Sequence, residues 1–430
     1  MSLIADPLAR LRIGALSTLP RLLRAQPGRE TLEDYRAQGG YEPLHDPEAL
    51  LEAIREAGLR GHGGAAFPTA RKIDSVRNGN GTPVVVGNGE EGEPSSAKDR
   101  WLLRNRPHLV LDGLRLAGAL VGARALHLYL SDDASHDSVI RALDELEGTG
   151  IMESGVHVTK VAPAYVAGEE SAVVQVLNGG PALPNEKPPR PFEQGVGGAP
   201  TLINNVETLA NFPIIQRVGA AEFRALGTDT SPGTFLLTIT GIDATGVYEA
   251  PYGVTLRRVL EELGEDTAAI TGFLMGGYFA GVLGRQALDI PLDYDSVSAA
   301  GSGLGCGAIG VITERSCPVA VSAGVMAYFA RENAGQCGSC FNGTAAMSAV
   351  LDALHRHQAE SSDIDRLQHW AGFLRGRGAC GTLDGATNVA AKLLREFPDQ
   401  VADHLSGRCE ICIAGAEVSD PPFAISRTGD

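Results

Sequence analysis

The 430-residue sequence contains seven cysteines but none before residue 306. Disulfide frameworks of secreted proteins spread paired cysteines through the chain, so this distribution argues against one. The sequence also lacks any apolar run of about 18 uncharged residues, which argues against a transmembrane helix. Residues 1–20 lack the charged leader and the cleavage site of a secretion signal. We therefore expect a cytoplasmic protein with no transmembrane segment.

Positive charge is scarce as well. The chain has 36 Lys and Arg against 52 Asp and Glu, a net charge of −16. Nucleic acids and anionic membranes attract basic surfaces, so we expect no nucleic-acid partner. With 43% hydrophobic and 20% charged residues the chain has the composition of a globular protein. Its length predicts two to four domains.

Apolar patterning divides the chain into five regions. A loosely organised lead-in precedes a region where strands and helices alternate, which predicts an α/β domain with a mainly parallel sheet. Two strands and a helix capped by Thr255 then suggest a small ubiquitin-like module. A mostly helical region follows, and a poorly ordered tail is expected at the end. The five regions are 1–45, 46–230, 231–300, 301–405 and 406–430.

Within the α/β region, individual elements can be placed. The predicted strands are 83–87, 126–130 and 156–161, and the predicted helices are 104–121, 135–147 and 168–177.

The segment from Gly58 to Phe67 has four glycines in seven positions. Such a backbone carries few side chains, so its N–H groups can approach a phosphate or a flat ring. Arg60 and Lys72 supply positive charge nearby. The segment follows a helix predicted to begin at an Asp46 cap. It predicts a ligand-binding loop, although taken alone it also fits an ordinary turn.

Three more polar segments follow along the chain. Residues 87–94 form an acidic loop directly after a strand, and residues 164–170 open a helix. Lys187-Pro-Pro189 is followed by residues 201–208, which contain two adjacent asparagines. Helix N-termini and strand ends are common sites for anions and cofactors. Each segment also has a structural alternative: a solvated turn, first-turn acids, or asparagines that stabilise a turn.

Together, in this order, the four segments resemble the NADH-binding flavoprotein subunit of respiratory complex I, a module also found in bidirectional hydrogenases and NAD-linked formate dehydrogenases. The resemblance extends from about residue 45 to residue 400. It implies a Rossmann-like FMN-binding domain, a ubiquitin-like α+β domain of the SLBB type, and a C-terminal helical bundle that holds a four-iron four-sulfur cluster.

The resemblance also implies roles for individual residues. Glu93 and Glu170 would be the catalytic carboxylates beside the nicotinamide nucleotide, and Lys187 would place that nucleotide. The residues expected to bind the cofactors are Gly61, Gly63, Gly64, Phe67, Lys72, Asn88, Glu90, Gly168, Lys187, Asn204 and Asn205.

Several positions depart from the family pattern. His62 stands where arginine is usual and Ala66 where glycine is usual. Ser75 and Arg190 replace two aromatic rings, and the loss of each stacking face would weaken nucleotide binding by ~1–3 kcal/mol. Arg190 could instead stack its guanidinium plane or bind an additional phosphate. NADH, NADPH and no dinucleotide therefore all remain open.

The cysteines depart further. Cys337, Cys340 and Cys380 fall where the family has cluster ligands, but Ala334 replaces the first one. Four outcomes are open: a three-iron cluster, a four-iron cluster with a non-cysteine ligand, a ligand borrowed from the pair at 409 and 412, or no cluster. The remaining cysteines, at 306 and 317, fit buried small residues.

The leading interpretation is an FMN-dependent NAD(P)H dehydrogenase that passes electrons to a separate ferredoxin-like or other iron–sulfur protein. One alternative runs the other way, with a partner reducing the FMN, which then reduces a small organic substrate. Another is a scaffold without chemistry. Retention of Lys72, Glu93, Glu170 and both adjacent asparagines argues against a scaffold, since a scaffold would not need this polar set.

Overall fold

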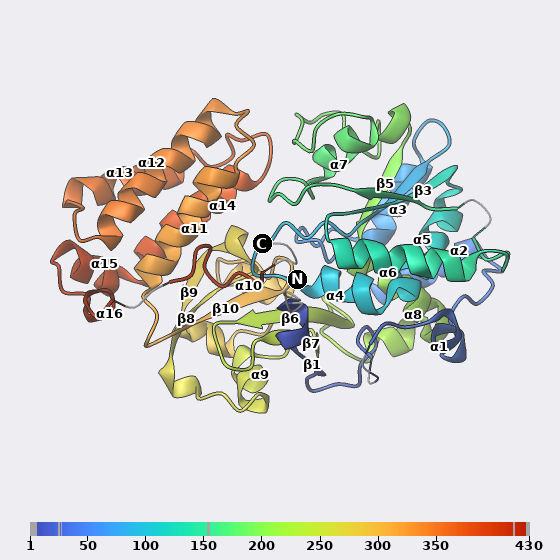
Figure 1. The fold of residues 1–430 in the computed structure, drawn as a ribbon, viewed down its shortest axis with the longest axis horizontal. Helices are drawn as coiled ribbons and strands as arrows, with labels where there is room; N and C mark the ends of the chain where they lie inside the picture. Colours follow the sequence, from blue (N-terminus) through green and yellow to red (C-terminus); the bar gives the residue numbers. More distant parts are fainter. Residues whose placement is uncertain (1–6, 25, 27, 153–154, 416–417, 427–430) are drawn as a thin grey trace, which may run out of the picture.

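A computed structural model describes residues 7–24, 26, 28–152, 155–415 and 418–426. Two sheets form its centre, one four-stranded and one six-stranded, and helices cover them (Figure 1). Short 3-10 helices occur at Pro7–Arg10, Val196–Gly198, Thr267–Ala269, Tyr278–Ala280 and Arg285–Asp289.

The four-stranded sheet has the order β4-β3-β2-β5, and all its strands are parallel. Its strands are β2 (Val84–Asn88), β3 (Ala125–Leu130), β4 (His157–Lys160) and β5 (Thr201–Asn205). The helices of this region are α2 (Pro47–Ala57), α3 (Thr69–Arg77), α4 (Lys98–Asn105), α5 (Pro107–Val121), α6 (Asp133–Leu146), α7 (Glu170–Leu177) and α8 (Val206–Arg224). This is the predicted α/β arrangement with Rossmann-like features. The helix predicted over 104–121 differs, because the backbone breaks at Arg106 and α5 restarts at Pro107.

Strand β2 shows why this sheet is covered on both faces. Val84, Val85 and Val86 are all fully buried. Successive side chains of a strand point to opposite faces, and Val85 packs with Leu114 and Phe212, whereas Val84 and Val86 pack with Val173. Each buried valine contributes roughly 1.5–3 kcal/mol of hydrophobic stabilisation. A continuous apolar run is what a buried parallel strand requires.

The strand order reverses between β2 and β5. From β2 the chain moves to β3 and β4 on one side, and then returns to β5 on the other side of β2. Ligands of open parallel sheets bind outside the carboxyl ends of the strands at such a reversal. The register pairs Gly87 with Asn204 and Asn88 with Asn205, so the polar ends of both strands meet there.

The six-stranded sheet is mixed and has the order β1-β7-β6-β10-β8-β9. Its strands are β1 (Arg12–Ala15), β6 (Thr234–Thr240), β7 (Gly246–Pro251), β8 (Ile270–Leu274), β9 (Val282–Gly284) and β10 (Ala308–Thr313), with α9 (Leu256–Glu262) and α10 (Tyr294–Ala299) between them. The predicted succession of two strands and a Thr255-capped helix is present as β6, β7 and α9.

Two features of this sheet differ from expectation. Residues 12–15, expected in a loose lead-in, form β1 and pair in parallel with β7. The lead-in also contains α1 (Leu32–Ala37), which begins with a capping box between Thr31 and Asp34. At the other end, β10 lies beyond residue 300 and pairs with β6 and β8. Both strands join partners distant in sequence, so local patterning does not reveal them.

The helices that follow pack around a second core. They are α11 (Pro318–Glu332), α12 (Gly338–His355), α13 (Ser361–Phe373), α14 (Thr382–Glu396), α15 (Pro398–Leu405) and α16 (Glu410–Ile413). Met326, Phe329, Met347 and Leu351 are among the buried residues of this core. Across the described ranges, no helix is both long and apolar enough to cross a membrane.

The described part of the tail is packed, contrary to the expected disorder. The backbone N–H of Ile425 donates to the carbonyl of Pro94 at 2.9 Å, and Ile425 is buried. Phe423 lies against Gly310, where a Cβ would come within 2.4 Å of the ring. The chain therefore returns from the helices to the loop that follows β2.

Candidate active site

The glycine loop lies over the junction of β5 and α8. A Cβ on Gly63 would sit 3.3 Å from the Cβ of Asn205, so the backbone approaches this junction closely. Gly61 closes the loop by donating its N–H to the carbonyl of Phe67 at 2.9 Å. Gly64 has a φ of +108°, which L side chains rarely adopt, and a Cβ there would meet nothing within 4 Å. The loop thus presents bare backbone to open space.

The strand ends bring the predicted amides together. The side chain of Asn88 donates to the carbonyl of Gly168 at 2.8 Å, which joins β2 to the turn before α7. The Oδ1 of Asn88 accepts from the N–H of the buried Glu90 at 3.2 Å. Asn204 is buried, and its Nδ2 has no hydrogen-bond partner among the described residues. An unpaired buried amide is costly, so this group is suited to a ligand acceptor.

Asn205 is used differently. Its Oδ1 accepts from the N–H of Glu207 at 2.9 Å, which caps α8, and its Nδ2 donates to Asp99 at 2.7 Å. Its side chain therefore positions the loop from beneath, while Asn204 carries the available donor.

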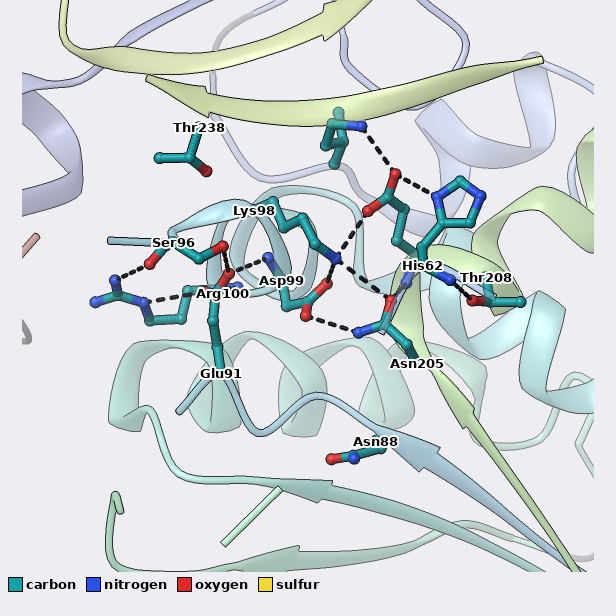
Figure 2. Close-up of polar contacts among 12 residues, drawn as sticks. His62, Asn88, Glu91, Ser96, Lys98, Asp99, Arg100, Asn205, Thr208 and Thr238 are labelled. Carbon is teal, nitrogen blue, oxygen red and sulfur yellow. Dashed lines mark hydrogen bonds and ion pairs between the residues drawn. The ribbon is translucent and has the colours of Figure 1, made fainter. Parts of the chain in front are cut away.

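A buried network of charges supports the glycine loop (Figure 2). The Nδ1 of His62 lies 2.6 Å from one oxygen of Glu207, and the ammonium of Lys98 lies 2.8 Å from the other. Lys98 also contacts Asp99 at 2.7 Å. Burial alone would raise the pKa of Glu207, but Lys98 and His62 lower it to about 2. His62, in place of the usual arginine, thus connects the loop to α4 and α8.

Sequence reasoning did not assign roles to Lys98 or Glu207. The signal in the sequence was the charged run Lys98-Asp99-Arg100 directly before the apolar residues Trp101, Leu102 and Leu103. Glu207 also accepts from the N–H of Leu236 in β6 at 2.8 Å, so the network reaches the second sheet.

Lys72 and the start of α7 place cations and carboxylates beside the loop. The ammonium of Lys72 donates to the carbonyl of Ile203 in β5, and burial lowers its pKa. Lys187 contacts both Glu169 and Glu170, lying 3.1 Å from the latter. Arg190 lies 3.7 Å from Glu170. Glu170, predicted to be catalytic, is thus held by two cations.

Glu169, to which the sequence assigned no role, positions the start of α7. Its side chain caps α7 by accepting from the N–H groups of Ser171 and Ala172, at 2.9 and 3.3 Å. The sequence feature that could have predicted this capping role is the adjacent acidic pair Glu169-Glu170 at the start of a helix.

Glu93 lies between the two sheets. One of its oxygens accepts from the N–H of Tyr278 at 2.9 Å, and the other accepts from the hydroxyl of Ser95 at 2.8 Å. Burial raises the pKa of Glu93 to about 7. Such a carboxyl can hold or release a proton near neutrality. Burial raises the pKa of the Tyr165 hydroxyl, and the charges of Glu93 and Cys380 add to that effect.

Phe67 supplies an exposed aromatic face beside the loop. Its ring is 48% exposed, and the guanidinium of Arg71 lies 5.8 Å from its centroid. Ser75, one turn further along α3, donates its hydroxyl to the carbonyl of Arg71 at 2.9 Å and offers no face. Arg190 is exposed.

The three predicted cluster cysteines are brought together. Cys337 precedes α12 and Cys340 lies in its first turn, while Cys380 lies just before α14. The N–H of Ala379 donates to the sulfur of Cys337 at 3.5 Å. Burial raises the pKa of Cys340 to about 12, with the nearby Cys380 and Cys337 thiols adding to the effect.

Comparison with known proteins agrees with this arrangement. The sequence model of the Nuo51 FMN-binding domain matches residues 54–214, and that of the NADH-ubiquinone oxidoreductase-F iron–sulfur binding region matches residues 320–404. An NADH-quinone oxidoreductase subunit of Rhizobium meliloti is 33% identical over 89% of this chain and 96% of its own. The chain belongs to the family of NADH-binding FMN subunits.

Members of this family also occur in hydrogenases. The NADP-reducing hydrogenase subunit HndC of Solidesulfovibrio fructosivorans is 31% identical over 90% of this chain and 83% of its own. The crystal structure of an air-oxidised NAD+-reducing [NiFe]-hydrogenase matches with a TM-score of 0.77 and 33% identity. That match covers 84% of this chain and 63% of the hydrogenase chain. The family's FMN-binding domain and 4Fe-4S binding region are both present here.

The residues of this protein fit an FMN group. Bare backbone at Gly63 and Gly64, the unpaired Nδ2 of Asn204 and the cation of Lys72 converge where the strand order reverses. These are the donors that a phosphate and a flat polar ring require.

One predicted source of a fourth cluster ligand is excluded. His404, whose Nε2 lies 3.7 Å from the sulfur of Cys412, contacts the carbonyl of Leu354 in the last turn of α12. Fourteen residues separate Leu354 from Cys340, about 21 Å of helix. Cys409 and Cys412 therefore lie at the far end of α12. Cys317, expected to be a simple buried residue, lies with them.

Proposed function

We propose that this protein takes hydride from NADH or NADPH in the crevice between β2 and β5 and passes electrons singly to a separate iron–sulfur protein. The observation that carries the proposal is the reversal of strand order, with the glycine loop and the asparagine-bearing ends of β2 and β5 around it. When bound, FMN supplies the two-electron acceptance and one-electron release that such chemistry needs.

In this proposal the chain's own groups bind and orient. The N–H groups of Gly63 and Gly64, with Lys72, hold the phosphate side of the cofactor, and Asn204 holds its polar ring edge. Gly61, whose N–H binds the Phe67 carbonyl, and Asn88, whose side chain binds Gly168 and Glu90, shape the pocket around it. Gly168 and Glu90 pack beside Asn88, and Asn205 fixes the floor of the site. This division follows from which groups are engaged within the protein and which are available.

The nucleotide would lie against Phe67 and the start of α7. The exposed Phe67 face can stack on a base or nicotinamide ring. Lys187 and Arg190 are cations at the edge of this surface, paired with Glu170. We infer that they hold nucleotide phosphates, while Glu170 keeps them in place. Arg190 then favours NADPH, because an exposed guanidinium can bind an additional phosphate.

Electrons would leave toward α12. Glu93 accepts from the N–H of Tyr278, and the adjacent Phe279 ring lies within 3.0 Å of where a Cβ on Gly381 would sit. Gly381 follows Cys380 directly, so the three-cysteine group lies on the side of the crevice that carries Glu93. We propose a cluster held by Cys337, Cys340 and Cys380, with one iron bound by a non-cysteine group or absent. Glu93, with its raised pKa, holds the proton that balances charge beside this route.

The regions around the site complete the proposal. We assign residues 46–230 to the FMN-binding domain, the second sheet to an SLBB domain and the helices from α11 onward to a bundle that holds the cluster. The arrangement of β6, β7 and α9 and the shared core of α11, α12 and α14 support these assignments.

Stopped-flow absorption of anaerobically purified, FMN-loaded protein tests the proposal. Both nucleotides should bleach the flavin band, NADPH faster, and Arg190→Ala should reduce the NADPH preference at least about tenfold. Glu170→Gln should slow bleaching, and the exposed neighbour Glu186 provides a matched control as Glu186→Gln. A flavin that neither nucleotide reduces would overturn the proposal.

The reverse direction is a second candidate, motivated by Ser75 and Arg190, which leave fewer stacking faces for a dinucleotide. In that case reduced ferredoxin would bleach the flavin in the stopped-flow experiment, and neither NADH nor NADPH would do so.

A further inference from the structure

Four metal-binding side chains converge at the end of α12 farthest from the candidate active site. They are Cys317 before α11, His404 in α15, and Cys409 and Cys412 at α16. Their ligand atoms all lie within 4.8 Å of one another. Figure 1 shows α15 and α16 together at the outer end of the helical part. Neither the FMN site nor the three-cysteine group uses any of these residues.

The distances match a tetrahedral ion. Sulfur atoms about 2.3 Å from a central zinc lie about 3.8 Å from one another. The sulfurs of Cys317 and Cys409 are 3.9 Å apart. The Nε2 of His404 lies 3.2 Å from the sulfur of Cys317 and 3.7 Å from that of Cys412. Three thiols and one imidazole are a common ligand set of structural zinc.

The imidazole of His404 is held in the orientation that a ligand needs. Its Nδ1 lies 3.0 Å from the carbonyl of Leu354, so Nδ1 carries the proton and the Nε2 lone pair points at the sulfurs. His357 stacks on this ring at 4.6 Å and 12°, and its own Nδ1 lies 3.0 Å from the His404 carbonyl. His404 is fully buried, and Cys317 and Cys409 are buried beside it.

We propose that Cys317, His404, Cys409 and Cys412 bind one Zn²⁺ ion, and that this ion fastens the C-terminal segment to the helical part. A disulfide explains the group less well, because it would leave an oriented histidine and a third sulfur unused. The inference does not depend on the proposed function.

The proposed zinc site precedes the segment in which the chain runs back from the helices. Residues 418–426, here called the C-terminal strap, run from the helices back to the loop that follows β2 of the four-stranded sheet. Arg331 pairs with Asp420 at 2.7 Å, and Tyr278 donates its hydroxyl to the carbonyl of Pro422. Arg100 donates to the carbonyls of Ile425 and Ser426, at 3.4 and 3.3 Å.

The far end of the strap meets the loop that carries Glu93. Arg100 also contacts Glu91 at 3.2 Å, and the N–H of Ile425 bonds to Pro94. The helix that precedes the strap, α16, is a single turn of four residues. Such a short helix is marginal in isolation, so a zinc ion joining it to α11 and α15 would hold the whole strap in place.

Metal content of the full chain tests the proposal directly. Protein expressed with zinc and purified anaerobically should contain one zinc per chain by mass spectrometry, independent of its iron content. Cys412→Ser and His404→Ala should each lower zinc to below about a fifth of that value, with iron unchanged. Cys306→Ser, which lies outside both cysteine groups, is the matched control and should keep its zinc.

Two measurements keep the test decisive if a variant fails to fold. Wild-type protein grown with Co²⁺ should show the visible bands of tetrahedral cobalt–thiolate coordination. Removal of zinc from wild-type protein by a chelator should expose the strap to limited proteolysis near residues 418–426. Wild-type protein without zinc, iron in place of zinc, or an unchanged proteolysis pattern after zinc removal would overturn the proposal.

Discussion

Helix α12 has a cysteine group at each end, and the two groups differ in almost every respect. The group at its start, Cys337 and Cys340 with Cys380, is spaced like a family motif and lacks one ligand at Ala334. The group at its end has four potential ligands whose ligand atoms lie within 4.8 Å of one another, and their spacing in the sequence does not predict the full set. The first suits a cluster with an open position, and the second suits a closed, structural ion. The number of ligands thus distinguishes the two groups: the incomplete set suits the proposed electron-transfer cluster, and the complete set suits the proposed structural ion.

The largest expected contrast is in thermal stability. Cys409→Ala should lose zinc and lower the melting temperature of the helical region by about 12–24 °C, corresponding to roughly 3 kcal/mol for a domain of about 100 residues. Cys340→Ala should lower it by less than half as much, because its group is closer to the surface and the iron proposed there would serve electron transfer. Differential scanning calorimetry of both variants, with Cys306→Ser as control, measures this. A larger loss in Cys340→Ala would reverse the comparison.

A second contrast concerns iron. Ala334→Cys supplies the thiolate that the first group lacks, so iron should rise from about three to about four atoms per chain and the cluster should survive air longer. Zinc content should not change, because Ala334 lies at the opposite end of α12. Metal analysis and the decay of cluster absorption in air test this. Equal air sensitivity of wild type and variant would show that another group already completes the cluster.

The smallest expected effect is a change in unfolding free energy at Glu93, which lies on the crevice side of the group formed by Cys337, Cys340 and Cys380. Its pKa is raised to about 7, so the protonated form is favoured in the folded protein. The stability it contributes is complete below its ordinary pKa near 4.5 and is lost as pH rises through 7. Relative to wild type, Glu93→Gln should therefore gain about 1–2 kcal/mol in unfolding free energy between pH 5 and pH 8.

Urea unfolding at the two pH values measures this change, with zinc content as an internal reference that should stay constant. Glu186→Gln, on the surface, should show no pH-dependent difference from wild type. A Glu93→Gln difference that is the same at both pH values would mean that Glu93 is ionised throughout.

What the sequence could reveal follows from how local each signal is. The Asp46 and Thr255 caps and the valines of β2 act within a few residues, and the structure places them as predicted. The polar segment after β2 was found because ligands bind at the strand ends of α/β sheets. The segment at residues 201–208 was found through its two adjacent asparagines, and strand β5 itself was not predicted. Roles for Lys98 and Glu207 could not be found this way, since their pairing depends on α4 meeting α8.

The second cysteine group was missed for the same reason. Cys317 and His404 are far apart in sequence, and only the packing of α11 against α15 brings them together. The segment His404 to Cys412 contains a partial signal, a histidine followed by two closely spaced cysteines. Recognising a metal site from this segment also requires Cys317 and the Leu354 carbonyl that orients His404. Only the tertiary structure brings these two groups to the segment.

The pairing of β1 with β7 sets an order in which the molecule is completed during synthesis. Arg12 pairs with Gly246, so the first strand leaves the ribosome long before its partner exists. At roughly 5–20 residues per second it waits about ten to fifty seconds, during which the intervening sheet can fold alone. β1 therefore has to remain unpaired without aggregating, and its brevity, four residues with an exposed first half, suits that wait.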